Sequence, residues 1–407
     1  MVKKLLFILF ITLFRTAPFA CWSQGITISA KVLDKETNEP LGYASIGLKS
    51  IAIGTISNEE GNFDFHLPSE YRNEVMVISM LGYKNFEAPV WSMVKESQVI
   101  KMEKSPIVLD EIVVSDTLRG GDILEIALSR IEKNYPMQPF LMDGFYLDVK
   151  KVGGTYISLL EAAVRIYDDN YAEPRNKYKL RERVRLIEVR QSLGYESRFT
   201  TYFDQDNLLE DLLLHNNIRY RLFEDGDKLF SSMIREKNSF YDAHETYVIS
   251  YNGDYFLKLY IDKEDFSIIH LEFEQGFEDD FLGKRNNLVS KFAGIKKKLD
   301  FRKFQGKMYP GFISITSKIN WYDSETNVLK FETELFQQLL INKITPNAKE
   351  RIRSTEKMRN YGLQFQDQPY NKQFWDNYNV IKETPLDIKI IEDLEKHVPL
   401  NQQFEDN

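Results

Sequence analysis

The sequence is poor in the residues from which most catalytic and redox sites are built. It has one cysteine in 407 residues, which excludes an intrachain disulfide and a site with several thiolate ligands. Its five histidines are scattered: His66, His215, His244, His270 and His397. The chain also has no His-Glu-x-x-His pair, no Gly-x-Ser-x-Gly elbow and no phosphate-binding glycine loop. We therefore expect no catalytic residues, no metal and no cofactor.

The chain also lacks an excess of positive charge. Lys and Arg number 53 against 61 Asp and Glu, which gives a net charge of −8. Phosphate contacts need a basic surface, so nucleic acid is not expected as a partner. After the first residues there is no apolar run of about 20 residues, the length that a spanning helix needs. We expect no mature transmembrane helix, and membrane association stays open.

Residues 1–23 are typical of a secretory signal peptide. Lys3 and Lys4 precede an apolar run at residues 5–14, and small residues follow at 17–23. We therefore expect export.

The fate of Cys21, the single cysteine, depends on where the signal is cut. Cleavage before it would leave a residue for lipidation, whereas cleavage after it would leave no thiol. Pro18 stands where lipoprotein signals usually carry Leu. Both outcomes remain open.

Residues 25–104 have the pattern of a small β-sandwich. Residues 26–33 and 43–48 alternate apolar and polar side chains, as strands do. Gly54 and Gly61 are expected at turns between strands.

Three segments of this region carry a family resemblance: residues 40–49 (PLGYASIGLK), 53–65 (IGTISNEEGNFDF) and 78–83 (ISMLGY). Their order and spacing resemble the carboxypeptidase regulatory-like domain, a transthyretin-like module. The resemblance implies a sandwich that accompanies other domains and does no chemistry itself. It is also similar to the sandwich that precedes TonB-dependent transporters, which implies a periplasmic or outer-membrane-associated protein.

Residues 105–118 are predicted to be an extended linker, because a proline is followed by a short β-branched run. Within it, Glu111, Ile112, Val113 and Val114 resemble the box that adds as a strand to TonB in those transporters. Strand addition needs only an exposed edge peptide. The alternative is that this segment docks as an internal strand.

Residues 119–345 are predicted to form a helix followed by a large curved sheet. Asp122 is expected to cap the helix, with Glu125 completing a capping box, and Pro136 follows its end. The apolar stripe of the helix is expected to pack on the sheet.

The rest of this region reads as an antiparallel meander, interrupted by a short helix at 207–215. In residues 312–321, apolar and polar side chains alternate, so one face is buried and one is wet. Residues 255–270 resemble a strand-turn-strand unit of lipoprotein-carrier-type half-barrels. That resemblance implies a face that holds an acyl chain, and the alternative is a core filled by the same side chains. The fold class is thus mainly β, with a sandwich, a half-barrel-like curved sheet and a helical tail.

A run of cations occupies every second position and would share one face of a strand: Lys177, Lys179, Arg181, Arg183 and Arg185. Such a stripe suits an anionic ligand, such as a lipid phosphate. The alternative is a solvated face with nearby acidic partners. Residues 296–298 are three consecutive lysines, for which we expect a turn or an exposed edge.

Residues 346–407 form a tail of different character. Phe374, Trp375 and Tyr378 are expected to fasten it to the body of the protein, the alternative being a platform for sugars. A final helix is predicted after Pro385.

These features predict a non-catalytic, exported envelope protein with a binding or docking role. The leading hypothesis is that the curved sheet holds a lipid or acyl group. The alternatives are an adaptor between proteins, linked to TonB-dependent outer-membrane transport, and a hydrolase whose site the sequence does not reveal.

Overall fold

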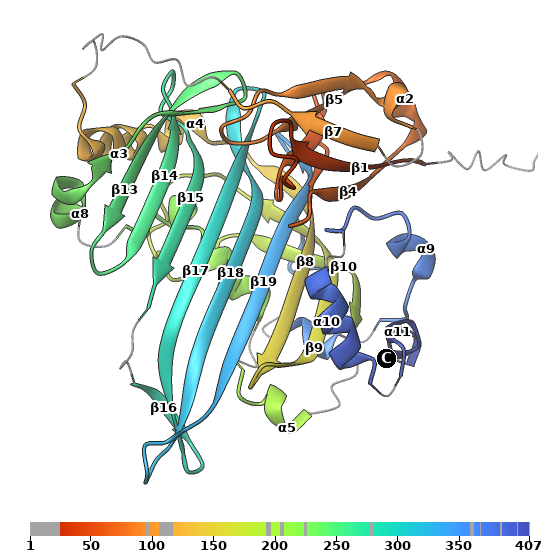
Figure 1. Cartoon of the computed structure of the whole chain (residues 1–407), viewed down its shortest axis with the longest axis vertical. Coiled ribbons are helices and arrows are strands. Elements are labelled where there is room, and N and C mark those ends of the chain that lie inside the picture. The colour runs from red at the N-terminus through yellow and green to blue at the C-terminus, as the bar shows by residue number, and fades with distance from the viewer. Residues whose placement is uncertain are drawn as a thin grey trace, which may run out of the picture.

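The structure is a computed structural model. It describes residues 25–94, 98–105, 117–192, 197–203, 207–223, 226–276, 281–358, 362–366, 368–382, 385–396 and 398–406. These residues form a small sandwich, one large sheet and helices on both faces of that sheet (Figure 1). The fold is mainly β, as the sequence predicts. None of the helices in these ranges is long and apolar enough to cross a membrane.

The N-terminal region is the predicted sandwich. One sheet has the order β4 (Asn62–Leu67), β1 (Ile26–Asp34), β7 (Gln98–Met102), and the other β3 (Gly54–Ile56), β2 (Ser45–Leu48), β5 (Val75–Ser79), β6 (Phe86–Pro89). The short helices η1 (Ser69–Asn73) and α2 (Val90–Met93) complete it. Inward side chains such as Ile28, Ile46, Phe63 and Phe65 are fully buried between the sheets.

The two glycines expected at turns of the sandwich have different roles. Gly61 does turn the chain, with φ +77°, and a Cβ there would lie 2.3 Å from the carbonyl oxygen of Val32. Gly54 instead begins β3, so the predicted turn is wrong there. A Cβ on Gly54 would lie 1.9 Å from Nη1 of Arg302, which belongs to the large sheet. Glycine is needed at this position because two parts of the molecule approach closely.

The large sheet has 12 strands, and its main path has the order β10-β9-β8-β19-β18-β17-β15-β14-β13-β11. The strands are β8 (Phe140–Val152), β9 (Thr155–Asp168), β10 (Arg183–Gln191), β11 (Ile234–Arg235), β12 (Ser239–Tyr241), β13 (His244–Asn252), β14 (Phe256–Asp262), β15 (Ile268–Gln275), β16 (Phe281–Arg285), β17 (Leu288–Phe304), β18 (Lys307–Asp323) and β19 (Leu329–Thr345). The helices outside the sandwich are α3 (Gly120–Ser129), α4 (Ile131–Asn134), α5 (Ser197–Thr200), α6 (Leu208–Leu214), α7 (Asn217–Tyr220), α8 (Gly226–Ser232), η2 (Leu363–Phe365), α9 (Lys372–Trp375), α10 (Pro385–Leu394) and α11 (Leu400–Asp406).

The sheet is antiparallel, but it is not one uninterrupted meander. The first long strand, β8, pairs with the last, β19, over a register from Thr333 opposite Val152 to Thr345 opposite Leu141. Two meanders are therefore joined side by side, and α5 to α8 lie in the connection between them. Strands that are neighbours in sequence, β10 and β11, end up at opposite ends of this order.

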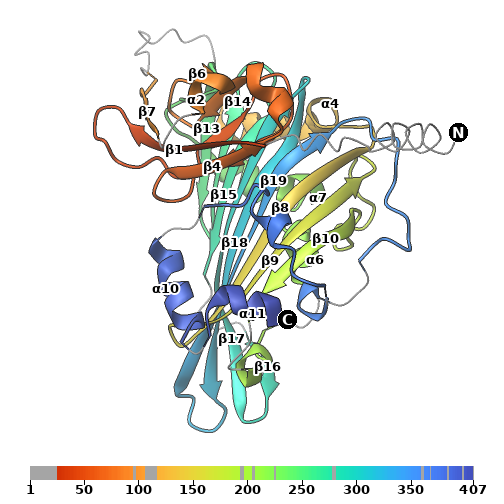
Figure 2. The same ribbon diagram turned by 90° about the vertical axis from the view of Figure 1, so that its right-hand side faces the viewer.

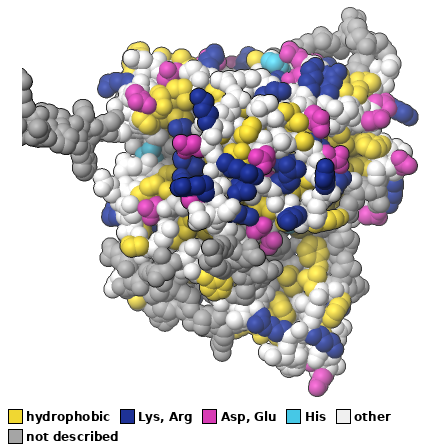
Figure 3. Space-filling model, turned by 180° about the vertical axis from the view of Figure 1, so that it is seen from behind, with side chains coloured by type: hydrophobic (Ala, Val, Ile, Leu, Met, Phe, Trp, Pro, Cys, Tyr) yellow, Lys and Arg dark blue, Asp and Glu magenta, His cyan; other side chains and the backbone are white. Residues whose placement is uncertain are grey.

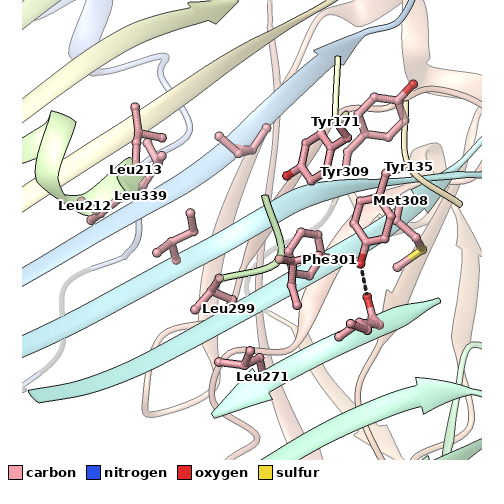
Figure 4. Close-up of a cluster of buried hydrophobic side chains, with 14 of the residues drawn as sticks. Tyr135, Tyr171, Leu212, Leu213, Leu271, Leu299, Phe301, Met308, Tyr309 and Leu339 are labelled. Atoms are coloured by element: carbon pink, nitrogen blue, oxygen red, sulfur yellow. Dashed lines mark hydrogen bonds between the residues drawn. The ribbon is translucent and has the colours of Figure 1, made fainter. Parts of the chain in front are cut away.

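Helices cover one face of the large sheet, which we call the inner face. Figure 2 shows α6 and α7 on this side, and the sandwich and α10 on the other, outer side. Leu212 and Leu213 of α6 pack with strand residues such as Leu339 and Leu299 in one continuous core (Figure 4). The described helices thus fill much of the inner face, as in the filled-core alternative.

The N-cap of the predicted helix is Arg119, three residues before Asp122, and the helix begins at Gly120. The capping box predicted for Asp122 and Glu125 is therefore wrong. Asp122 instead completes a box with Arg119, since its carboxylate accepts a hydrogen bond from the Arg119 backbone N–H at 2.9 Å. A Cβ on Gly121 would lie 2.1 Å from the carbonyl oxygen of Phe230. Gly120 and Gly121 form the start of the helix, and because they have no side chain, this end of the helix can lie close to α8. It ends at Ser129 and is followed by the separate helix α4.

The three lysines at 296–298 are not at a turn or an edge. They lie within β17, which is paired with β15 on one side and β18 on the other. Lys296 forms a cross-strand ion pair with Glu274 at 2.8 Å, and Lys297 lies 4.8 Å from the centre of the Phe273 ring. Partners on the neighbouring strand make these central positions possible.

A buried ion network joins β9, the segment before β10 and α7. The Arg219 guanidinium, 0% exposed, donates to both carboxylate oxygens of Asp168 at 2.7 and 3.0 Å. Glu182 lies 4.0 Å from the same guanidinium and accepts a hydrogen bond from the Tyr220 hydroxyl. One cation thus compensates two carboxylates that are removed from water.

Replacing Arg219 with Ala should lower the free energy of unfolding by about 3–5 kcal/mol, because two buried carboxylates would lose their cation. Urea denaturation measures this change. The matched control is Arg351→Ala, which breaks a half-exposed pair with Asp169 and should cost about 1 kcal/mol or less. An equal loss of unfolding free energy in the two variants would contradict the claim that the buried network stabilises the fold more than the surface pair does.

The same network should make stability depend on pH. Burial, together with the Asp168 charge, raises the pKa of Glu182 to about 7 from its ordinary value of 4.5. The folded state then holds this proton more tightly than the unfolded state. Its contribution to the free energy of unfolding is therefore fully present below pH 4.5 and is lost as the pH rises to about 7.

Glu182→Gln should remove that contribution, because the amide stays neutral. The unfolding free energy of the variant, measured between pH 4.5 and 7, should fall less steeply with pH than that of the parent. Parallel pH profiles would show that Glu182 does not titrate in this window.

Candidate ligand-binding site

Three cavities of similar size lie against the large sheet. One, of about 350 Å³, lies on the inner face beside α6. A second, of about 270 Å³, lies between the outer face and the tail helices. A third, of about 280 Å³, lies between the outer face and the sandwich. Ligand sites in proteins span roughly 300–1,000 Å³. The inner cavity lies within this range and the other two lie just below it, so each suits only a small ligand or a short chain.

The second cavity, which we call the tail cavity, has apolar walls on both sides. Alternate residues of β8 and β9 face it from the sheet, and α10 and α11 close it from outside. Its apolar lining comprises Phe145, Leu147, Val149, Leu159, Phe336, Ile381, Ile390, Ile391, Leu400 and Phe404.

One end of the tail cavity is polar. Arg190 of β10 forms an ion pair with Glu161 of β9, and the two residues are direct cross-strand partners. Burial lowers the pKa of Arg190, but the Glu161 charge outweighs it, so the pKa lies above its usual value and the cation persists. The guanidinium also lies 4.5 Å from the centre of the Trp375 ring and 5.1 Å from that of Phe404. A fixed charge therefore stands beside an aliphatic chamber.

The tail is held by the aromatic residues that the sequence singled out. Trp375 is 4% exposed and contacts the Phe145 ring edge-on at 6.4 Å between centroids. The Tyr378 hydroxyl donates to the carbonyl oxygen of Gly144 at 3.0 Å. These contacts attach the tail to the large sheet, as predicted. The alternative was that the aromatic residues form a binding platform for sugars.

The sequence analysis missed α11, which completes the tail cavity. A signal was present, because Leu400 and Phe404 are four residues apart and share a helical face, and Pro399 precedes the first turn. The helix α10 was predicted, and Ile390 and Leu394 are buried on its apolar stripe.

The inner cavity is the place where the half-barrel resemblance predicts an acyl chain. Its described walls include Leu208, Leu214 and Ile315, but polar groups lie among them. The Gln337 amide donates to the Tyr146 hydroxyl and to the Leu208 carbonyl oxygen. The tail cavity also has polar lining residues, which are Asn58, Glu59, Gln338 and Glu395 besides Arg190 and Glu161, but it has more apolar lining residues than the inner cavity.

The five cations at alternate positions do not share a strand face. β10 begins only at Arg183, and a turn precedes it, in which Tyr178 N–H donates to Asn176. Lys177 forms an ion pair with Glu173 at 3.2 Å, and Arg185 lies 3.8 Å from Glu356.

The predicted strand is therefore wrong for Lys177, Lys179 and Arg181, because a turn at Lys177 and irregular chain after it precede β10. Seen from behind, the molecule has Lys and Arg side chains interspersed with acidic ones (Figure 3). Binding of an anionic ligand by these cations stays a prediction.

Two other predicted sites lie outside the described residues. They are Cys21, with the signal segment, and the partner strand at residues 111–114.

One group of side chains that could hold a metal ion is His244, Asp262 and Glu264. His244 Nδ1 lies 3.1 Å from Asp262 and 3.5 Å from Glu264. The Lys303 ammonium lies 3.6 Å from the same Asp262 carboxylate and 2.7 Å from Asp265. A lysine therefore already supplies positive charge here, and the geometry gives no reason to assign a metal.

Comparison with known proteins identifies the domain family of the N-terminal region. Residues 28–114 match the CarboxypepD_reg-like domain family. The N-terminal region is a CarboxypepD_reg-like domain. A 93-residue stretch is also 34% identical to the TonB-dependent receptor SusC of Bacteroides thetaiotaomicron. That match covers 23% of this chain and 8% of the receptor, so it concerns the CarboxypepD_reg-like domain and not the transporter as a whole. An envelope-associated, non-enzymatic role fits these matches.

Solved structures resemble the chain only distantly. A DUF1329 family protein from Desulfovibrio piger is 10% identical, with a TM-score of 0.25, over 58% of this chain and 96% of that protein. The Pseudomonas aeruginosa MucA/MucB complex gives 12% identity and a TM-score of 0.19, over 56% of this chain and 99% of that one. Likenesses at these scores carry no argument about function.

Phe404→Ala should loosen the tail, because Phe404 is 7% exposed and packs with Val149 and Leu394. Removing a buried Phe side chain costs about 3–5 kcal/mol, so trypsin cleavage after Lys396 should accelerate by about tenfold or more. Limited proteolysis followed by mass spectrometry measures the rate. Phe365→Ala is the control, because that ring is 57% exposed, and an equal acceleration there would contradict a specific role for Phe404.

Proposed function

We propose that this chain is a non-enzymatic binding protein of the cell envelope, exported by the segment at residues 1–23, that holds an aliphatic chain in the tail cavity. The apolar chamber between the outer face and the chain's own tail helices carries this proposal. A cavity of roughly 150 Å³ accommodates a benzene ring, so about 270 Å³ accommodates a chain of roughly ten carbons.

The surroundings of the chamber support an acyl group in particular. The Arg190 guanidinium pairs with Glu161, and its remaining N–H groups would donate to the oxygens of a carboxylate or ester headgroup. The methylene chain would lie among Leu147, Val149 and Phe336. The lid consists of α10 and α11, which pack through few buried side chains and can open without disturbing the sheet.

The described histidines support binding over hydrolysis, the alternative in which the chain carries an unrecognised hydrolase site. His270 is held between Asp300 and Glu272, and burial lowers the pKa of His215 to about 3, with Lys297 contributing. Among the described contacts, neither ring hydrogen-bonds to a serine. His66 Nδ1 does lie 2.9 Å from the Thr27 hydroxyl, but neither residue lines one of the three cavities.

A second candidate function is an adaptor linked to TonB-dependent outer-membrane transport. The observation that favours it is the 34% identity of the CarboxypepD_reg-like domain to that of SusC. Residues 111–114 would then supply the partner strand. Recovery of a TonB-dependent receptor with the full-length protein from envelope extracts, and its loss on deletion of residues 111–114, would support this candidate.

The tail cavity is tested by titrating the full chain with decanoate. Leu147→Trp fills the tail cavity and should weaken binding by about tenfold or more. The matched control, Ile319→Trp, fills the inner cavity and should leave the affinity unchanged. Calorimetry measures both.

If only Ile319→Trp weakens decanoate binding, the ligand binds in the inner cavity, and the assignment to the tail cavity is refuted. Absence of decanoate binding by the parent protein would refute the aliphatic ligand altogether.

A further inference from the structure

The third cavity, between the CarboxypepD_reg-like domain and the outer face of the large sheet, has a different chemistry from the tail cavity. Its domain wall includes Thr55, Ile56 and Met80, and its sheet wall includes Lys298 and Arg302 of β17. The domain is seated here by a β-bridge between Ile53 and Lys343 of β19. The cavity therefore exists only while the domain is docked on the sheet.

Arg302 reaches into this seam with an incompletely satisfied guanidinium. Its Nη2 donates to the carbonyl oxygen of Ile341 at 3.3 Å, and its Nη1 lies where a Cβ on Gly54 would clash. Its Nε is buried and, among the described residues, has no hydrogen-bond partner. Burial lowers the pKa of Arg302, and only the Tyr241 phenol is placed to oppose that effect. A partly buried cation without a carboxylate partner is unfavourable, so the site is one where an anion would be favoured.

A second polar atom in the same cavity is also unsatisfied. The Thr55 hydroxyl, on the domain wall, is buried without a partner among the described residues. Buried hydroxyls are nearly always hydrogen-bonded, to protein or to an ordered molecule. Thr55 and Arg302, one from each wall, thus line the same cavity, and each has a polar atom without a partner among the described residues.

The charges around the cavity favour a single negative charge. His270 is bracketed by Asp300 at 2.5 Å and Glu272 at 3.1 Å. Burial lowers the pKa of His270, but these carboxylates raise it by more, to about 9, so the ring is cationic at neutral pH. With Lys298 and Arg302 there are three cations against two carboxylates, which leaves an excess of one positive charge.

The remaining walls are apolar. Ile56 and Met80 of the domain face Phe312 and Leu340 of the sheet. Ile56, Phe312 and Leu340 are buried in one cluster, whereas Met80 is half-buried, so a ligand with an apolar body would cover Met80 further.

We propose that the interdomain cavity binds a small amphipathic carboxylate, whose charged group pairs with Arg302 and accepts a hydrogen bond from Thr55, while its apolar body lies against Ile56, Met80 and Phe312. This site is separate from the tail cavity and goes beyond the proposed function. Arginine suits the role because its planar guanidinium matches the geometry of a carboxylate.

The test uses the full chain with benzoate as the probe and benzamide as a neutral ligand of nearly the same shape. Benzoate should bind about tenfold or more tightly than benzamide, and it should raise the melting temperature of the parent protein. Arg302→Met should abolish both the preference and the shift. The control is Arg185→Met, which removes an arginine of β10, a strand at the end of the sheet. It should change neither the preference for benzoate nor the shift in melting temperature.

Two further variants keep the outcome decisive. Thr55→Val, which preserves shape, should weaken benzoate binding even if Arg302→Met fails to fold. Leu147→Trp in the tail cavity should leave benzoate binding intact. If this variant loses benzoate binding, benzoate binds in the tail cavity and the proposal is overturned.

Equal affinities for benzoate and benzamide, or no binding at millimolar benzoate, would also overturn it. In that case a higher melting temperature for Arg302→Met would indicate that the cavity holds ordered water only.

Discussion

A large open sheet is stable only if both of its faces are covered, and this requirement determines how the rest of the molecule is arranged. Side chains alternate between the faces of every strand. In β19, Leu339 and Ile341 point to the inner core and Leu340, between them, points outward to a second cluster. Neither face can be left to water. The helices of the connection cover the inner face, and the CarboxypepD_reg-like domain and the tail helices cover the outer one.

Covering two faces also brings charges out of water, and the strand register decides which of them can be tolerated. Lys296 has Glu274 directly opposite, and Arg190 has Glu161, so each charge is neutralised by a cross-strand neighbour. Pairs fixed by register lose little additional side-chain entropy, because the backbone already holds the two residues together. Arg302 differs from these residues, because the residue directly opposite it on β18 is Tyr309, which carries no negative charge. Its guanidinium is half-buried beside Gly54 of the docked domain, and no acid of the sheet lies directly opposite it.

Much of the fold could be predicted from local patterns, whereas the candidate sites could not. Alternation identified most strands, the loop before Phe63 required Gly61, and the order of three motifs indicated the sandwich. The pairing of β8 with β19 was not predictable, because many apolar strands suit each other equally well and the sequence separation is long. The start of α3 depended on the approach of Gly121 to Phe230 in another helix. Each cavity is made by segments far apart in sequence, so Arg302 looks in the sequence like any charged residue of an alternating strand.

Both outer cavities lie at seams, where one covering layer ends and another element meets the sheet. Independent modules that dock on a surface fit it less perfectly than strands fit one another, so space remains at their edges. A ligand that occupies such a seam contacts both sides and therefore binds only the docked arrangement. Its binding free energy stabilises the docking, and docking raises its affinity by the same amount. A domain without chemistry of its own can in this way be essential to binding, because it supplies a wall that the sheet alone does not have. The Ile53–Lys343 bridge and the close approach of Gly54 to Arg302 are the contacts through which this coupling would pass.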